Sequence, residues 1–374
     1  MKIIFNCISN VAGGGVQNSA NFIYYALKDK RHEYLFLVSR PVNSVLESWG
    51  VNHKSIIVFD DRKRVLDTQR KVRWLEREFK PQLVYTMAGP NLLCFKSFHM
   101  LGTSNPYITH AKKINYFWDR SILKGIKSIC SAMFKGWIAR LSGDFYVFQT
   151  PTSRKGFCKR FLCPINKTAV IPNAIGADFV DNITSYTPWS GVDRPKVILC
   201  ASAYYSHKNI EILFRTARLL KERGELNVKF LLTIDNQSFS ELTQRYDNSD
   251  NMILNIGPYN YSKAIDIYKK ADAIVLPSLL ETFSTVYIEA IALGLPIFIP
   301  KESFAKDICQ DYAIYYDSLS EISLMNAIVS SENDEVESYK NRIKSIILSG
   351  YGNQEERYEK IALLFNRVAE LHNL

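Results

Sequence analysis

The stretch of residues 270–300 constrains the fold of this chain more than any other part of it. It reads KADAIVLPSLLETFSTVYIEAIALGLPIFIP. The apolar run at 273–276 predicts a buried strand, and a helical pattern follows from about 284 to 293. A glycine and a proline end that helix before a second apolar run at 295–299. Strand, loop, helix and strand in this order indicate a parallel α/β unit.

Two carboxylates lie inside this unit, Glu281 and Glu289, with seven residues between them. Glu281 is predicted in the loop after the first strand. Ser284 and Thr285 are predicted at the helix start, where free backbone amides and the helix dipole favour an anion. Since carboxylates accept hydrogen bonds from hydroxyl groups, the arrangement suits a phosphorylated, hydroxyl-rich ligand. The alternative is that both glutamates only cap or solvate a helix.

The string LPSLLETFSTVYIEAIALGLPI resembles the signature of the retaining glycosyltransferases of the family 4, or group 1, type. It carries their E-x7-E element and ends on a small residue followed by Gly-x-Pro. The resemblance implies the GT-B fold, with two Rossmann-like, doubly wound α/β domains and a cleft between them. It also implies transfer of a sugar from a nucleoside-diphosphate sugar, with retention at the anomeric carbon and without a cofactor.

The length of 374 residues favours two domains. We expect an acceptor-side domain at 1–180 and a nucleotide-sugar-binding domain at 190–350. The resemblance implies that a C-terminal helix at 354–374 packs back onto the first domain. The clustered polar and turn-forming residues at 178–194 predict the linker.

Composition narrows the location and the partners. The seven cysteines are scattered, which favours free thiols in a reducing cytoplasm and predicts no zinc site. The chain shows no apolar run long enough to span a membrane, and its first residues do not read as a signal peptide. We therefore expect a cytoplasmic protein, or one held peripherally on the inner face of the cell membrane. A net charge of +10 calls for an anionic partner: nucleic acid, a membrane surface or a phosphate-bearing substrate.

The first half of the chain alternates strand-like and helical patterns, which predicts a parallel sheet that binds ligands at its carboxyl edge. A glycine run follows the first strand, and the resemblance places Gly14 and Gly15 beside the donor diphosphate; a plain tight turn is the alternative. His110 follows a strand expected at 107–109. The resemblance places a histidine at such a strand end near the transferred sugar, whereas a lone histidine is otherwise structural. The predicted strands lie at 2–8, 34–38, 55–59, 83–87, 107–109 and 145–149.

Residues 112–140 mix basic and large aromatic side chains, with Asp119 as the only acidic residue among them. This pattern suits an interfacial helix on an anionic membrane. A core helix with a solvated basic face fits equally well. Single-stranded RNA binding uses similar chemistry, but no RNA-binding motif accompanies the pattern, so no nucleic-acid partner is expected.

In the second half, Lys208 matches the lysine with which the family stabilises the leaving diphosphate. The family's arginine is replaced by Ser202 or Ala203, so the leaving-group charge falls on Lys208, the helix N-termini and His207. Gly257 and Tyr259 lie in a loop that lines the nucleobase in the family, although a simple turn explains them equally well.

The resemblance assigns Glu281 to hydroxyls of the transferred sugar and Glu289 to the ribose. Phe283, Ser284 and Thr285 offer backbone groups to the phosphates, with Ser284 in place of the usual glycine. The residues predicted to be catalytic are Glu281, Lys208 and His110.

No D-x-D metal motif stands in a convincing place, so the chemistry is expected to be metal-independent. The expected acceptor is lipid-linked or a polysaccharide, in the synthesis of a bacterial O-antigen, capsule or lipopolysaccharide. The alternatives are a sugar-nucleotide epimerase of the same fold and a non-catalytic, membrane-associated partner of a transferase.

Overall fold

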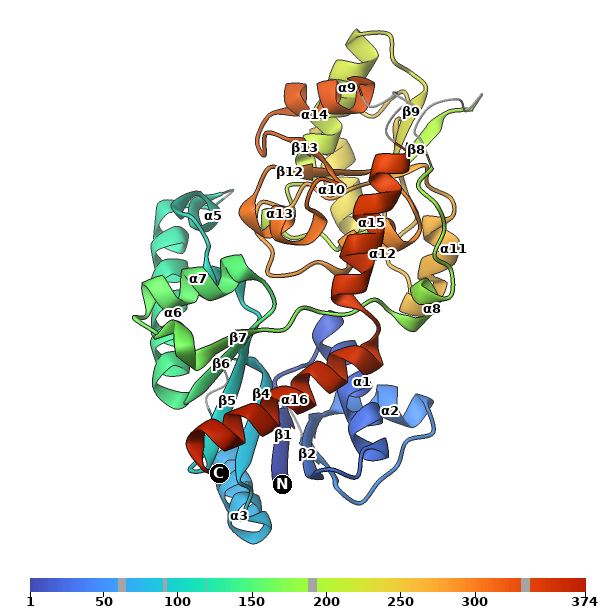
Figure 1. Ribbon diagram of the computed structural model, residues 1–374. Helices are drawn as coiled ribbons and strands as arrows, with labels where there is room; N and C mark the ends of the chain where they lie inside the picture. Colours follow the sequence, from blue (N-terminus) through green and yellow to red (C-terminus); the bar gives the residue numbers. More distant parts are fainter. Residues whose placement is uncertain (60–64, 90–92, 119, 188–193, 331–336) are drawn as a thin grey trace. The chain divides into compact units, whose positions relative to one another are not determined.

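The computed structural model describes residues 1–59, 65–89, 93–118, 120–187, 194–330 and 337–374. Asp119 and most of the linker's second half, 188–193, lie outside the described residues. The chain divides into two compact units (Figure 1). The first unit is Met1–Tyr116, Ser121–Ala174 and Asn353–Leu374, and the second is Phe117–Arg120 and Ile175–Gly352.

A seven-stranded parallel sheet forms the centre of the first unit, in the order β3-β2-β1-β4-β5-β6-β7. Its strands alternate their apolar side chains between two cores, because successive residues of a strand face opposite sides. Ile3 and Phe5 lie in one core and Ile4 in the other. The strands are β1 Lys2–Cys7, β2 Glu33–Ser39, β3 Ile56–Phe59, β4 Leu83–Gly89, β5 Phe98–Thr103, β6 Phe145–Phe148 and β7 Thr168–Val170.

Helices connect the strands and cover both cores. The helix α1 belongs to the same core as α16, and α3 belongs to the opposite one. The helices of this unit are α1 Gly14–Lys28, α2 Arg40–Ser48, α3 Val65–Phe79, α4 Pro106–Thr109, α5 Lys113–Phe117, α6 Ile122–Ser142, α7 Pro151–Arg160 and α16 Gln354–His372, with a 3-10 turn at Ile165–Lys167.

The strand predicted at 107–109 is wrong: these residues form α4. Asn105 caps that helix, because its side chain accepts a hydrogen bond from the backbone amide of Tyr107, and a proline occupies the first turn. The strand of this region is β5, whose apolar pattern is interrupted by His99. The buried His99 is satisfied by Thr86 at 2.8 Å and by the carbonyl of Ser142 at 2.7 Å. A polar residue with such partners is compatible with a strand interior, and the sequence does not reveal those partners.

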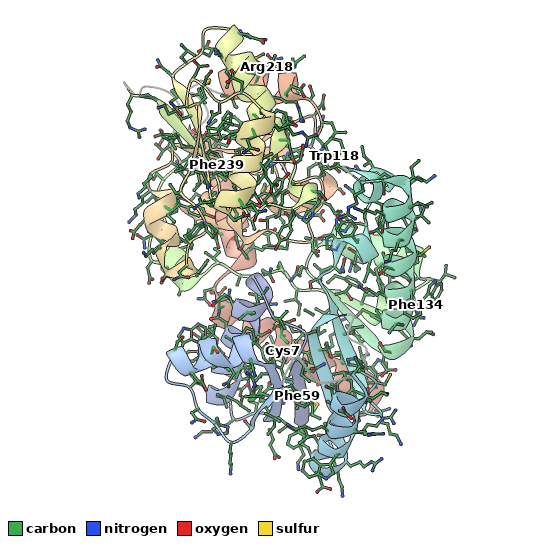
Figure 2. All side chains as sticks on the ribbon, turned by 180° about the vertical axis from the view of Figure 1, so that it is seen from behind. Cys7, Phe59, Trp118, Phe134, Arg218 and Phe239 are labelled. Carbon is green, nitrogen blue, oxygen red and sulfur yellow. The ribbon has the colours of Figure 1, made fainter. Side chains whose placement is uncertain are left out.

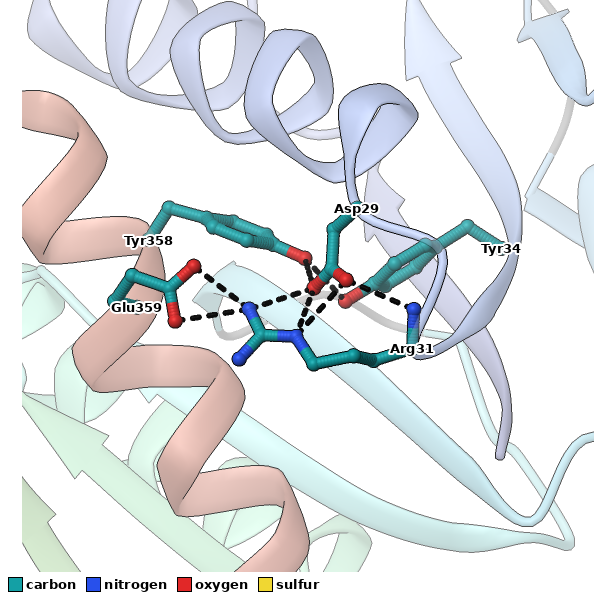
Figure 3. A network of polar contacts seen from close by, with 5 residues as sticks. All are labelled: Asp29, Arg31, Tyr34, Tyr358 and Glu359. Carbon is teal, nitrogen blue, oxygen red and sulfur yellow. Dashed lines mark hydrogen bonds and ion pairs between the residues drawn. The ribbon is translucent and has the colours of Figure 1, made fainter.

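The C-terminal helix α16 packs on the first unit through buried side chains that include Ile361 and Phe365. A polar network reinforces the contact (Figure 3). The guanidinium of Arg31 donates to Glu359 at 2.6 and 2.8 Å and to Asp29 at 2.9 Å. The hydroxyl of Tyr358 donates to Asp29 at 2.5 Å. Side chains far apart in the sequence thus fasten the last helix to the turn between α1 and β2.

The second unit is built on a six-stranded parallel sheet in the order β10-β9-β8-β11-β12-β13. Alternate side chains again enter two cores: Leu199 and Ile274 face one, and Ile198 and Val275 face the other. Two doubly wound parallel sheets confirm the predicted α/β architecture. The strands are β8 Lys196–Cys200, β9 Val228–Leu232, β10 Ile253–Asn255, β11 Ala273–Val275, β12 Ile297–Pro300 and β13 Ile314–Tyr316.

The helices of the second unit cover both faces of this sheet. Residues of α12, α13 and α15 enter the core that contains Leu199, and residues of α9 and α14 enter the other. The helices of the second unit are α8 Ala177–Val180, α9 Glu211–Glu222, α10 Asn236–Arg245, α11 Ala264–Tyr268, α12 Thr285–Ala292, α13 Ser303–Cys309, α14 Glu321–Ser330 and α15 Glu337–Tyr351, with 3-10 turns η2 Ser206–Lys208 and η3 Tyr261–Lys263.

Candidate functional site

The order of the strands in the second unit indicates where a ligand would bind. From β8 the chain runs outward to β9 and β10, and it then returns to place β11 on the other side of β8. The two neighbours are in register through Ala273 opposite Ile198 and Ile274 opposite Leu199. Beyond these two strands the chain continues to opposite faces of the sheet, to α9 after β8 and to α12 after β11. Such a switch point is the usual ligand-binding place of an open parallel sheet.

Lys208 and Glu281 meet at this switch point. Lys208 ends the turn η2 after β8, Glu281 lies in the loop after β11, and the ammonium donates to the carboxylate. The side chains are 16% and 15% exposed, so the pair is mostly withdrawn from water. The amide of Leu279 donates to the carbonyl of His207 at 2.8 Å and ties the two loops together. The structure therefore brings together two charges that stand 73 positions apart in the sequence.

The backbone after Lys208 has the left-handed conformation at Asn209, where φ is 51°. Asparagine tolerates this conformation better than most residues. Its buried side chain donates to the carbonyl of Ser318 at 3.3 Å. The turn that presents Lys208 is therefore held from outside its own loop.

His207 stacks on Tyr205, with ring centroids 5.8 Å apart and planes 8° apart. Burial lowers the pKa of His207, Glu281 opposes that shift, and Lys208 reinforces it. Burial therefore favours the neutral form of this imidazole. The contribution of His207 to leaving-group stabilisation stays a prediction, whereas Lys208 is ion-paired on this loop.

The helix α12 begins at Thr285, four positions after Glu281. Ser284 is its N-cap residue, with φ −97° and ψ 120°, and its side chain makes no capping hydrogen bond. Any residue adopts this extended conformation, so serine in place of glycine imposes no backbone strain. The first turn holds no acidic residue, and its amides face the same loop as Glu281. The ring of Phe283 packs edge-on against that of Tyr351, with ring centroids 5.4 Å apart. This contact holds the segment of chain that leads into α12.

Glu289 is only 3% exposed, and its carboxyl group is hydrogen-bonded by two tyrosines. Tyr261 donates to one carboxylate oxygen at 3.1 Å and Tyr268 donates to the other at 2.8 Å. Burial raises the pKa of Glu289, while the hydrogen bonds from Tyr268, Tyr261 and Thr285 oppose that rise. Sequence reasoning missed both tyrosines, because each stands more than twenty positions from Glu289 and no local pattern connects them.

Gly257 and Tyr259 lie in the loop after β10. The φ of Gly257 is 75°, a conformation that favours glycine, so its identity follows from the turn itself. Burial raises the pKa of Tyr259 to about 12, and the charge of Glu289 adds to the rise. Tyr259 therefore belongs to the same tyrosine cluster as Tyr261 and Tyr268.

Gly14, Gly15 and His110 lie in the first unit. Gly14 and Gly15 open α1, and Gly13 before them has φ 61° and ψ −152°. Gly13 is thus the glycine that this turn requires, which the sequence did not single out. His110 follows α4 rather than a strand, and its Nδ1 lies 2.8 Å from the hydroxyl of Thr109.

Comparison with known proteins places this architecture among the GT-B glycosyltransferase structures. A glycosyltransferase from Rickettsia africae superposes with a TM-score of 0.71 at 14% identity, covering 98% of both chains. Anabaena HepE in complex with UDP and glucose superposes with a TM-score of 0.70 at 17% identity, covering 98% of this chain and all of HepE. At such identities the likeness shows the fold.

Residues 189–363 match the model of the glycosyl transferases group 1 family. Most of the matched residues lie in the second unit, and residues 353–363 belong to the last segment of the first. An uncharacterized glycosyltransferase of Methanocaldococcus jannaschii is 28% identical over 149 residues. That match covers 38% of this chain and 38% of the relative.

Among the described residues, no helix is long and apolar enough to cross a membrane. Within the same part of the chain, no three His, Cys, Asp or Glu side chains group so as to hold a metal ion. All seven cysteines are free thiols.

Proposed function

We propose that the protein transfers a glycosyl group from a nucleoside-diphosphate sugar to an acceptor hydroxyl, with retention at the anomeric carbon. One observation carries the proposal: Lys208 and Glu281 meet beside the N-terminus of α12, within the region that matches the group 1 domain. A cation, the N-terminal amides of a helix and a carboxylate thus lie at one end of one sheet. A diphosphate and a sugar hydroxyl require that combination.

The proposed chemistry follows from where charge develops. The bond between the anomeric carbon and the phosphate oxygen breaks, and the electron pair leaves with the diphosphate. The ammonium of Lys208 and the amides of Phe283, Ser284 and Thr285 stabilise that negative charge. The acceptor oxygen then bonds to the anomeric carbon on the same face, and its proton passes to the phosphate oxygen that has left. The chemistry is proposed to need no metal, because the ammonium of Lys208 and the N-terminus of α12 neutralise the charge of the leaving diphosphate.

The remaining assignments are proposals for binding. Glu281 accepts hydrogen bonds from hydroxyls of the sugar, and Glu289 with its tyrosine cluster orients the ribose. Gly257 and Tyr259 line the base. From the first unit, Gly14 and Gly15 approach the diphosphate, and His110 contacts the transferred sugar.

We place uridine first among the donor bases, because HepE has the same fold and binds UDP and glucose. We propose a lipid-linked or polysaccharide acceptor, in the assembly of a bacterial O-antigen, capsule or lipopolysaccharide. An enzyme for such an acceptor works on the cytoplasmic side, at or near the membrane surface.

A donor screen tests the proposal. The melting temperature of the full chain is measured with UDP, GDP and ADP and with their hexose conjugates, and donor cleavage is then followed as release of the nucleoside diphosphate. We expect one diphosphate to stabilise the protein and its sugar conjugate to be cleaved slowly by water. Conversion of the donor into an isomer without acceptor would instead identify an epimerase. Nucleotide binding without cleavage or transfer to any acceptor would identify a non-catalytic partner.

A further inference from the structure

The helix α6, Ile122–Ser142, turns its bulky apolar side chains away from its own domain. At about 3.6 residues per turn, side chains that are three or four residues apart share one face of a helix. Two such faces of α6 differ in side-chain size. The side chains of one face are small and buried, and those of the other face are large and exposed.

The buried face of α6 consists of Gly125, Ala132, Gly136 and Ala139. Small side chains allow close approach, and Gly136 shows how close it is. A Cβ atom at Gly136 would lie 2.0 Å from the ring of Phe161. The helix is therefore anchored to the first unit through its glycines and alanines.

The exposed face follows the spacing 123, 126, 130, 134, 137 and 141. Leu123 is 81% exposed, Phe134 is 67% exposed and Leu141 is 82% exposed. Figure 2 shows Phe134 on the outer side of the helix. A soluble helix normally turns such residues inward, since each of them gains about 1.5–3 kcal/mol from full burial. The orientation of α6 is therefore the reverse of that of an ordinary surface helix.

The charges on the same helix have one sign. Lys124, Lys127 and Lys135 are exposed beside the apolar face. From residue 120 to residue 143 the chain contains no aspartate or glutamate. An apolar face bordered by lysines matches the boundary between the acyl chains and the headgroups of an anionic bilayer. A second copy of this chain would meet the same positive charges, which disfavours self-association through this face.

We propose that the outward face of α6 binds the surface of an anionic lipid bilayer, with Leu123, Phe134 and Leu141 entering the interface and the lysines contacting the headgroups. The helix lies in the plane of the surface and does not span the membrane. This proposal does not depend on the sugar-transfer reaction, because it rests on α6 alone. It nevertheless provides a means of bringing the enzyme to a lipid-linked acceptor.

Vesicle co-sedimentation of the full chain tests the proposal. Vesicles of phosphatidylglycerol and phosphatidylethanolamine are compared with phosphatidylcholine vesicles at about 0.1 M salt. We expect binding to the anionic vesicles and weak binding to the neutral ones. The triple variant Leu123→Gln, Phe134→Gln, Leu141→Gln should lower the partition coefficient about 100-fold. Replacing Lys124, Lys127 and Lys135 by glutamine should lower it by a similar factor, since each lysine contributes about fivefold near an anionic surface.

A matched control is available on α16, where Leu363 and Leu371 are 60% and 63% exposed. Their replacement by glutamine should leave vesicle binding unchanged. A second readout is a polarity-sensitive dye on Cys130, which is exposed on the apolar face of α6, in a Cys94→Ser background. Its emission should shift to the blue with anionic vesicles.

Three results would overturn the proposal. The first is failure to bind anionic vesicles, and the second is equal binding by the α6 triple variant when its melting temperature is unchanged. The third is a wild-type dimer that the triple variant makes monomeric while vesicle binding stays the same. Loss of donor cleavage together with retained vesicle binding would instead count against the proposed function only.

Discussion

The pair of Lys208 and Glu281 allows a test that separates a structural ion pair from a catalytic one. The perturbation is a cycle of three variants: Lys208→Met, Glu281→Gln and the double variant. Methionine keeps most of the length of lysine, and glutamine keeps the shape of glutamate, so each change removes mainly charge.

The expected loss of stability follows from burial. Removing one member of a fully buried pair costs about 3–5 kcal/mol, because the other charge loses its ion-pair partner. Both side chains keep about one-sixth of their exposure, so the remaining charge can partly reach water. We therefore expect about 3 kcal/mol for each single variant, at the lower end of that range. For a unit of 150–250 residues this corresponds to a decrease of roughly 6–12 °C in melting temperature.

Stability and turnover should diverge in the double variant. Replacement of both charges by neutral groups of similar shape is often neutral for stability, so the melting temperature should return close to that of the wild type. Turnover should stay low, because removal of one group that stabilises a leaving anion costs about 10²–10³ in rate. The assay is release of nucleoside diphosphate, measured beside calorimetric melting of the same preparations.

One result would refute the reasoning: recovery of both stability and turnover in the double variant. The pair would then only hold two loops together, and the leaving diphosphate would be neutralised elsewhere. Single variants with unchanged melting temperatures would contradict the burial argument instead.

Three further predictions concern groups around the site and the last helix. Tyr268→Phe should cost about 1–3 kcal/mol, since it removes a buried donor from Glu289, and should weaken nucleotide binding in calorimetric titration. Tyr261→Phe should cost less, because Tyr261 is 41% exposed as a residue and its hydrogen bond to Glu289 is longer, at 3.1 Å. Burial alone would raise the pKa of Asp29, but its hydrogen bonds from arginine and tyrosine lower it to about 2. The interactions of Asp29 therefore stabilise the fold fully at pH values above its ordinary pKa near 4, and this stabilisation, about 2 kcal/mol in all, is lost as the pH falls toward 2. The free energy of unfolding, measured from pH 5 to 2, should show this loss, and Asp29→Asn should flatten that pH dependence. Gly13→Ala should destabilise the first unit by about 1–3 kcal/mol in urea unfolding, because alanine disfavours φ 61° with ψ −152°; an unchanged midpoint would contradict the argument from strain.

The region around Glu281 shows how far local patterns reach. The strand, loop and helix of residues 270–300 follow from apolar periodicity and from the residues that end each element, and they appear as β11, α12 and β12. The same reasoning failed at α4 and β5. In both places a side-chain hydrogen bond outweighed the apolar pattern, at Asn105 in one case and at His99 in the other.

The amino-acid sequence by itself determined the alternation of strands and helices in both sheets and the spacing of the acidic pair, because both depend on residues at most about eight positions apart. Only the tertiary structure decided that Lys208 meets Glu281, since the return of β11 to the side of β8 closes a distance of 73 positions. The tertiary structure also decided which face of α6 is exposed. The sequence contains a stripe of small residues and a stripe of large ones, and either could have faced the core. The close approach of Phe161 to Gly136 leaves room only for the small stripe, and the large apolar side chains are therefore exposed.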